Sequence, residues 1–137
     1  MVPTNNAPSI TNSSKVIETV LPELSEKIAS FSMTVPVPDG STIDLTLNLK
    51  NNTSKDEINS FFDEKTTKDD LYKIIGITYD PIVSSDVVGN SLSGIVDGLS
   101  TMCIDDNKLK LMIWFDNGWG YASRIIEAVT MLGSQFE

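Results

Sequence analysis

The side chains best suited to chemistry are concentrated in the stretch WFDNGWGY, residues 114–121. An acid, an amide and a glycine (Asp116, Asn117 and Gly118) stand there among four aromatic residues. Polar groups set among aromatic rings are typical of a ligand site. A short polar residue before an apolar run is equally typical of a helix N-terminus, with Asp116 or Asn117 as the cap and Trp119 packing against the first turn. The stretch therefore predicts a ligand site, a helix entry, or both.

Nucleophilic catalysis has little support in the sequence. Cys103 is the single thiol, inside the predicted strand STMCID, and the chain contains no histidine. A thiol or hydroxyl nucleophile needs a neighbouring base, so Ser–His and Cys–His pairs are excluded, as are His-ligated metals. We expect Cys103 to be a small core residue and the chain to hold no catalytic residue.

A metal or acid–base site among the aspartates is also disfavoured. These residues occupy predicted strand ends and turns and lack the alternating acids, glycine and closing glutamate of a calcium-binding loop. The residues considered are Asp86, Asp97, Asp105, Asp106 and Asp116. We expect no metal.

The charge balance restricts the partners. Nineteen acidic residues against ten basic ones give a net charge of −9. Nucleic acids and anionic membranes bind through Lys and Arg, so neither is expected as a partner. No secretory leader or membrane-spanning run is visible, and a single cysteine fits a reducing compartment. These features predict a cytoplasmic protein.

The first 50 residues predict an irregular stretch, a helix and a hairpin. Residues 1–14 are rich in Pro, Asn, Ser and Thr and are expected to be irregular. A helix is expected from Lys15 to about Lys27, capped by Ser13 or Ser14 and interrupted by Pro22. Apolar residues then alternate over 31–37 and 43–49 around a Pro-Asp-Gly turn, which predicts a hairpin with one apolar face.

The remainder predicts two helices around a set of short strands. Ser54 and Glu57 form a capping box for a helix with Ile58, Phe61 and Phe62 on its buried face, followed by a charged loop over 63–70. Strands are expected at 74–78, 82–84, 92–96, 99–104 and 108–115. The final helix carries Ile125, Ile126, Val129 and Leu132 on one stripe and ends at Gly133. The fold class is α+β, a largely antiparallel (mixed) sheet with helices packed on one face, and 15–137 are expected to form a single domain.

Three stretches together resemble the catalytic (C-terminal) domain of glyceraldehyde-3-phosphate dehydrogenase. They are PSITNSSKVIETVLPELSEKI running into SMTVPVPDGSTIDLTLNL, then YDPIVSSDVVGNSLSGIVDG, then WFDNGWGYASRI. Their order and spacing also match, over about residues 5–134. The resemblance implies an NAD-dependent, phosphorylating aldehyde dehydrogenase with a Cys–His pair and a separate NAD-binding domain. This chain shows no S-C-T-T-N motif, no histidine and no G-x-G-x-x-G fingerprint.

The resemblance carries four residues over as vestigial contacts. Thr11 matches a threonine that helps bind inorganic phosphate, although Asn12 replaces the glycine expected beside it. Thr34 stands where the family usually has a phosphate-clamping arginine, and it offers no charge. Asn117 matches the asparagine that contacts the nicotinamide carboxamide, and Tyr121 an aromatic near that ring.

The family's charged ligand groups are absent, so the resemblance predicts a truncated, non-catalytic homologue that binds no NAD by itself. An apolar sheet face predicts self-association, as a homodimer or higher oligomer. The residues of that face are Phe31, Met33, Val35, Leu45, Leu47, Met112 and Trp114. The alternatives are half of a split NAD-dependent dehydrogenase, completed by a chain that carries the NAD domain, or a decoy subunit of the full-length enzyme.

Overall fold

The computed structural model describes residues 5–68 and 71–135. The chain divides into two compact units, Met1–Pro38 and Asp39–Glu137, which we describe separately. The boundary falls inside the region 15–137, whose organisation as a single domain stays a prediction.

The first unit contains a two-stranded antiparallel sheet and one helix. Strand β1 (Ala7–Ser9) pairs with β2 (Ser32–Thr34), and a hydrogen bond of 2.6 Å joins the hydroxyls of Ser9 and Ser32. Helix α1 (Ser13–Val20) is followed by a 3₁₀ turn, η1 (Pro22–Leu24). The helix ends at Val20, so the predicted bound near Lys27 was wrong; the predicted interruption at Pro22 is found, because proline cannot continue the backbone ladder. Expecting an irregular stretch was wrong for β1 and for the start of α1, which has no side-chain cap.

The predicted hairpin over 31–49 is wrong. Strand β3 (Ser41–Asn48) lies in the second unit and pairs over its whole length with β7 (Lys108–Phe115), from Ser41 opposite Phe115 to Asn48 opposite Lys108. The alternation was identified correctly in each strand. Alternation with a period of two shows which side chains share a face of a strand, but it does not identify the strand's partner. The partner of β3 is the distant strand β7 and not the neighbouring segment 31–37.

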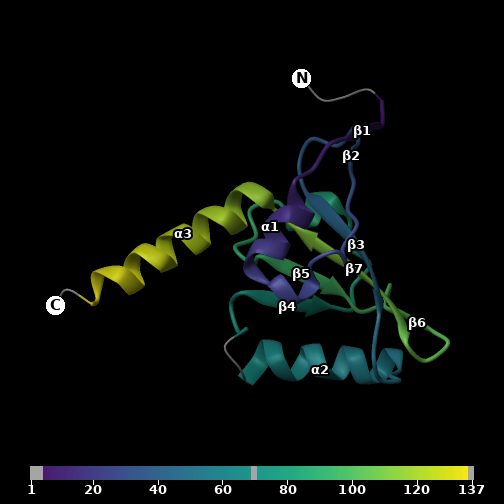
Figure 1. Cartoon of the computed structure of the whole chain (residues 1–137). Helices are drawn as coiled ribbons and strands as arrows, with labels where there is room; N and C mark the ends of the chain where they lie inside the picture. The colour runs from purple at the N-terminus through teal and green to yellow at the C-terminus, as the bar shows by residue number, and fades with distance from the viewer. Residues whose placement is uncertain (1–4, 69–70, 136–137) are drawn as a thin grey trace. The chain divides into compact units, whose positions relative to one another are not determined.

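The second unit is built on a sheet whose main path runs β3-β7-β5-β4 (Figure 1). Strand β4 (Ile75–Thr78) is parallel to β5 (Gly94–Asp97), whereas the other pairs are antiparallel. Strand β6 (Met102–Ile104) forms an additional pair with β7. The strand expected at 82–84 is not formed, and a 3₁₀ turn, η2 (Ser84–Val87), begins at its end. The mixed, mostly antiparallel sheet with its helices is an α+β fold.

Helix α2 (Lys55–Lys68) covers one face of this sheet. Its capping box is confirmed: the Glu57 amide donates to Ser54 Oγ at 3.2 Å, and the Ser54 amide donates to Glu57 Oε2 at 2.9 Å. The helix continues through most of the stretch expected as a charged loop, and the side chains of Asp63 and Glu64 are exposed there. Asp69 and Asp70 lie outside the described residues.

The core lies between α2 and the sheet. Val96, Leu109 and Leu111 are almost fully buried there. Partly buried apolar residues surround them: Leu45, Leu47, Leu49, Ile58, Phe62, Ile75, Ile77 and Ile113. This cluster is the main hydrophobic contribution in the second unit.

The residues predicted to form one apolar sheet face do not share a face in the structure. Leu45 and Leu47 pack into the core, whereas Met112 and Trp114 lie on the opposite face, since side chains alternate along β7. That open face also carries Thr42, Asp44, Thr46 and Lys110, and an ion pair of 2.9 Å joins Asp44 and Lys110. Phe31, Met33 and Val35 belong to the other unit and are exposed there.

Helix α3 (Asn117–Gly133) follows β7 after one residue. Among the described residues of the unit, only the first turns of α3 lie against the sheet and its loops (Figure 1). Every residue from Ile125 to Gln135 is exposed. The predicted apolar stripe is formed, but it is uncovered in this unit. In the described part of the chain, no helix is long and apolar enough to cross a membrane.

Candidate functional site

The start of α3 is fixed by the buried carboxylate of Asp116. Its Oδ1 accepts from the Trp119 amide at 2.8 Å, which is the predicted helix cap. Its Oδ2 accepts from the Gly89 amide at 2.8 Å, which ties the loop before β5 to the helix. These two backbone hydrogen bonds stabilise the charged form and lower the pKa of Asp116 below its ordinary value. The position of Asn117 is therefore set by its neighbour.

A second buried carboxylate, Asp97 at the end of β5, organises the turn beneath this site. It accepts from the amide and hydroxyl of Ser100, each at 2.9 Å, and from Trp114 Nε1 at 3.3 Å. Burial alone would raise the pKa of Asp97, but these hydrogen bonds hold it below the ordinary value. The contact fixes the indole ring at the end of β7.

Asn117 and Tyr121 lie one helical turn apart and share the rim of a shallow depression of about 250 Å³. Its other lining residues are Ser93, Phe115, Asp116, Gly120 and Arg124. Both carried-over side chains are exposed, and Tyr121 is 70% exposed. The structure thus brings these two predicted residues together at a rigid helix start, with an amide and a phenol available to a ligand.

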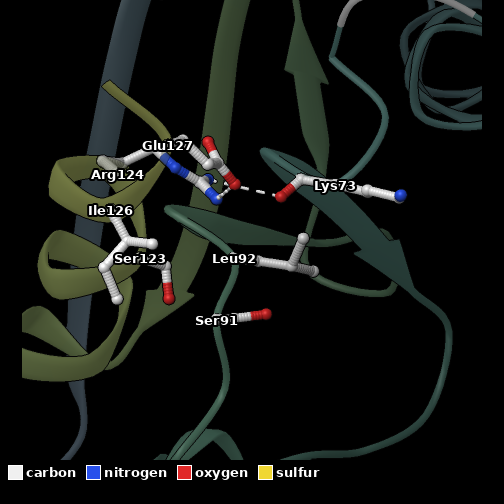
Figure 2. Close-up of a pocket in the computed structure, with 7 residues that line it drawn as sticks. All are labelled: Lys73, Ser91, Leu92, Ser123, Arg124, Ile126 and Glu127. Atoms are coloured by element: carbon white, nitrogen blue, oxygen red, sulfur yellow. Dashed lines mark hydrogen bonds and ion pairs between the residues drawn. The ribbon is translucent and has the colours of Figure 1, made fainter. Parts of the chain in front are cut away.

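Arg124 lines both this depression and a neighbouring hollow of about 360 Å³. Figure 2 shows the residues that line the hollow. Its guanidinium donates to Glu127 at 2.6 Å, to the Lys73 carbonyl at 3.3 Å and to Ser93 Oγ at 3.2 Å. The Lys73 ammonium points away from this arginine (Figure 2). Because Arg124 is already paired with a carboxylate, the hollow does not form a strong anion site.

Thr11 and Thr34 both belong to the first unit and are not brought together. Thr34 pairs in register with Ala7, whereas Thr11 follows the other end of β1. The Thr11 hydroxyl is engaged with Ser13, at 2.6 Å from its Oγ and 3.2 Å from its amide. Within this unit the two threonines do not form a common phosphate site.

Cys103 lies on β6, partly buried, and its Sγ contacts the Thr53 carbonyl oxygen at 3.1 Å. The thiol therefore serves as a hydrogen-bond donor to backbone. Among the described residues, no group of three or more acids or cysteines is placed to hold a metal.

Two aspects of the site were not anticipated by the sequence. The aromatic residues of 114–121 do not all serve the core, since Trp119 is 58% exposed. The double role of Asp116 was also missed, because its second partner, Gly89, is 27 positions away in the sequence. Asp97 could have been identified from the segment SGIVDG, in which an acid is the last residue of a largely buried strand.

Comparison with known proteins identifies the family. Residues 2–117 match the profile of the glyceraldehyde 3-phosphate dehydrogenase C-terminal domain. Glyceraldehyde-3-phosphate dehydrogenase of Borreliella burgdorferi is 45% identical over 126 residues, which cover 91% of this chain and 38% of that protein. The cytosolic enzyme of Ginkgo biloba is 38% identical over 130 residues, 95% of this chain and 38% of the relative.

A third relative, glyceraldehyde-3-phosphate dehydrogenase 2 of Bacillus subtilis, is 33% identical over 130 residues. The chain thus spans about 38% of the length of these curated relatives. The matched profile covers most of the sequence and agrees with the α+β fold. The chain belongs to the family of glyceraldehyde-3-phosphate dehydrogenase C-terminal domains.

Proposed function

We propose that these 137 residues form a self-associating module of the dehydrogenase fold and that the isolated polypeptide carries no oxidoreductase chemistry. The observation behind this proposal is the environment of the single thiol. Cys103 Sγ contacts a backbone carbonyl on β6, and the sequence contains no histidine to act as its base. The cytosolic Ginkgo relative supports a cytoplasmic location for the module.

An activity assay tests the missing chemistry. The purified chain is incubated with glyceraldehyde 3-phosphate, NAD and phosphate, and NADH formation is followed by absorbance. We expect no turnover and no calorimetric signal for NAD, because the single thiol, Cys103, contacts a backbone carbonyl and the sequence contains no histidine to act as its base. Turnover that Cys103→Ser abolishes would overturn the proposal, since the thiol would then be the catalytic nucleophile.

The open face of the sheet supports self-association. Trp114 and Ile95 are register partners on β7 and β5, and Met112 lies on the same face. These side chains are only partly buried in the single chain. A second copy would cover them, and closed twofold pairing uses the same surface on both partners.

Sedimentation of Met112→Asp tests this contact, with Thr46→Asp as a matched control near the edge of the same face. We expect Met112→Asp to halve the mass of the sheet-face assembly and the control to leave it unchanged. An unchanged mass in Met112→Asp would refute a contact at the open face.

A second candidate, half of a split NAD-dependent enzyme, is favoured by Asn117 and Tyr121. Both remain exposed beside a depression, and the Asp116 contacts hold the adjacent backbone. Such a surface could complete a nicotinamide site supplied mainly by another polypeptide. Adding a polypeptide with the NAD domain and the Cys–His pair of a relative would then restore turnover, and Asn117→Ala would reduce it; no turnover on mixing would exclude this candidate.

The third candidate, a decoy subunit, predicts mixed particles. The chain and a full-length relative are combined and separated by size, with Met112→Asp as the control that removes the open-face contact. A mixed species lost in the variant would support the decoy, whereas separate elution of the two proteins would refute it.

A further inference from the structure

The chain places glycine directly after an acid or its amide at three positions: Asp39-Gly40, Asp97-Gly98 and Asn117-Gly118. In such a pair the side chain can close a five-membered ring onto the next backbone nitrogen, because glycine has no Cβ to obstruct the approach. The sequence alone does not distinguish the three pairs. The structure does, because each pair is held in a different way.

At the first pair, the carboxylate is turned toward the amide that follows it. The Gly40 amide donates to Asp39 Oδ1 at 2.7 Å, a contact between neighbours in the sequence. The Asp39 side chain is exposed, and Gly40 lies in irregular backbone with a φ of 83°. The carboxyl group and the nitrogen that ring closure would join are therefore already adjacent, outside any helix or strand.

The fold holds Gly40 from its other side. A Cβ built on Gly40 would overlap the Ser84 carbonyl oxygen, so the glycine backbone packs directly against η2. Glycine is required here both by this close approach and by the positive φ. The amide that faces Asp39 is thus fixed in position by the second unit.

The same residue pair is held differently at the end of β5. The Asp97 carboxylate accepts from the amide and hydroxyl of Ser100, each at 2.9 Å. The Gly98 amide donates instead to the Thr78 carbonyl oxygen at 2.9 Å, and Asp97 is 7% exposed. Both reacting groups are engaged elsewhere. Asp97 is therefore a chemically matched but structurally protected counterpart of Asp39.

The third pair, Asn117-Gly118, forms the first two residues of α3. In a helix each side chain is tilted toward the N-terminus and so away from the amide of the next residue. Ring closure there requires the helix start to open, and Asp116 opposes opening through the Trp119 amide at 2.8 Å. The first pair is the one that the fold aligns.

We propose that Asp39 isomerises spontaneously to isoaspartate in the folded protein, through a cyclic imide with Gly40. The Gly40 nitrogen attacks the carbon of the protonated Asp39 carboxyl group and forms a C–N bond. The C–OH bond breaks, and the hydroxyl leaves with the amide proton as water. Water then adds to either imide carbonyl and opens the ring, to aspartate or to isoaspartate. The net change is an isomerisation in which only water takes part.

The product changes the main chain directly after Pro38, the last residue of the first unit. In isoaspartate the chain continues through the side-chain carboxyl, so one methylene enters the backbone and the α-carboxylate becomes the free acid. The charge is unchanged. Because Gly40 is held against Ser84, the added methylene must be accommodated between a fixed glycine and the connection to the first unit. The proposal does not depend on self-association.

Ageing of the purified chain at physiological temperature is the first test. Electron-transfer fragmentation distinguishes isoaspartate from aspartate in the tryptic peptides 28–50 and 74–108, which contain Asp39 and Asp97. We expect isoaspartate at Asp39 to exceed that at Asp97 by about tenfold or more, because Asp97 reacts only when its turn opens. Equal accumulation at the two positions, or none at Asp39, overturns the proposal.

Ageing in guanidinium chloride separates the effect of the fold from that of the sequence. In the unfolded chain both positions are Asp-Gly pairs in flexible backbone, so their rates should converge. Asp39 should react at least as fast in the folded chain as in the unfolded one, because the fold holds its reacting groups together. A slower reaction at Asp39 in the folded chain would overturn the alignment on which the proposal rests.

Asp39→Glu is the matched variant, and circular dichroism checks its fold. It keeps the charge, but its carboxyl group would have to close a six-membered ring, so we expect the isomerised product in peptide 28–50 to disappear. Asp44→Glu changes the other acid of the same peptide and should leave the product at Asp39 unchanged. A product that persists in Asp39→Glu and is lost in Asp44→Glu would place the reaction at Asp44 and refute the proposal.

Discussion

Helices α2 and α3 belong to the same unit but relate to it in opposite ways. α2 carries many charged side chains and buries a narrow face with Ile58 and Phe62 against the core. α3 is far more apolar, yet its stripe of Ile125, Val129 and Leu132 is exposed. The apolar composition of a helix therefore does not show whether its apolar side is buried. That depends on whether the sheet of the same unit extends beneath it.

The polar contacts of the two helices differ in the same sense. α2 is tied to the sheet along its length, through Lys55 to the Leu99 carbonyl at 2.7 Å, Asn59 to the Gly98 carbonyl at 3.0 Å and Tyr79 to Asp63 at 2.7 Å. Among the described residues, α3 is tied to the sheet and its loops only near its start, at Asp116 and Arg124. Substitutions beneath α2 should consequently destabilise the unit more than substitutions on the exposed part of α3.

The largest effect is expected from Leu111→Ala beneath α2. Leu111 is 3% exposed, and removing its side chain leaves a cavity that costs about 3 kcal/mol of unfolding free energy. Met131→Ala on α3, where the side chain is 70% exposed, should change the unfolding free energy by less than about 0.5 kcal/mol. Urea denaturation followed by tryptophan fluorescence measures both. Equal losses would show that α3 is packed as tightly as α2.

Two glycines of α3 should respond differently to alanine. A Cβ at Gly120 would lie 2.8 Å from the Leu92 carbonyl oxygen, so the helix must shift at a cost of about 1–3 kcal/mol. Gly133 has open space, and alanine there should leave the unfolding free energy within about 1 kcal/mol of the parent or raise it. Urea midpoints of the two variants provide the comparison. A neutral Gly120→Ala would mean that the start of α3 is not held closely.

The N-terminus of α2 offers a smaller test. Ser54→Ala removes the oxygen that accepts from the Glu57 amide and should cost about 1 kcal/mol. Ser60→Ala, at an exposed position inside the same helix, should be neutral or slightly stabilising, since alanine favours helix. Thermal unfolding followed by circular dichroism distinguishes the two, and a Ser54→Ala midpoint no lower than that of Ser60→Ala would contradict the cap.

Acid should weaken the anchor of α3. Backbone hydrogen bonds from Trp119 and Gly89 lower the pKa of Asp116 from its ordinary 3.8. The resulting stabilisation is present in full above that value and is lost as the pH falls through the lower folded-state pKa. Urea unfolding between pH 6 and pH 3 should show this loss, and Asp116→Asn should reduce it. An identical acid dependence in the variant would assign the loss to other carboxylates.

Alkali should weaken a contact of α2. Burial, followed by the hydrogen bond to Asp63, raises the pKa of Tyr79 to about 12. This stabilisation is present below the ordinary tyrosine value of 10.0 and is lost as the pH rises toward 12, with a small effect because the side chain is 47% exposed. Ultraviolet titration of the three tyrosines should show one late transition, absent in Tyr79→Phe. A single transition near the ordinary value would refute the Asp63 contact.

The sequence predicted local features better than pairings. The α2 capping box, the Asp116 cap and the bounds of β7 are encoded by neighbouring residues, and the structure contains all three. The partner of β3 was missed, because alternation along 43–49 is equally compatible with a hairpin and with a distant strand. The packing of Leu45 on the α2 side, opposite to Met112, follows only from the β3–β7 register.

The same limit applies to the site. Asn117 and Tyr121 were found through a resemblance and lie one turn apart, so a local pattern was enough to place them together. The hydrogen bond between the Gly89 amide and the Asp116 carboxylate joins residues that are distant in the sequence, so no short motif predicts it. Thr11 and Thr34 matched family positions, but the register of β1 and β2 keeps them at opposite ends of the pair.

The pairing of β3 with β7 has a consequence for how the protein is made. Thr42 donates to the Ile113 carbonyl across 71 positions of the chain, and β7 also carries the β5 and β6 contacts. During synthesis, β3, β5 and β6 leave the ribosome before their common neighbour β7, so the sheet closes only after Phe115 has emerged. Contacts of such long sequence separation slow folding and prolong the exposure of strand edges. The nascent chain should therefore depend on chaperones until the last strand is available.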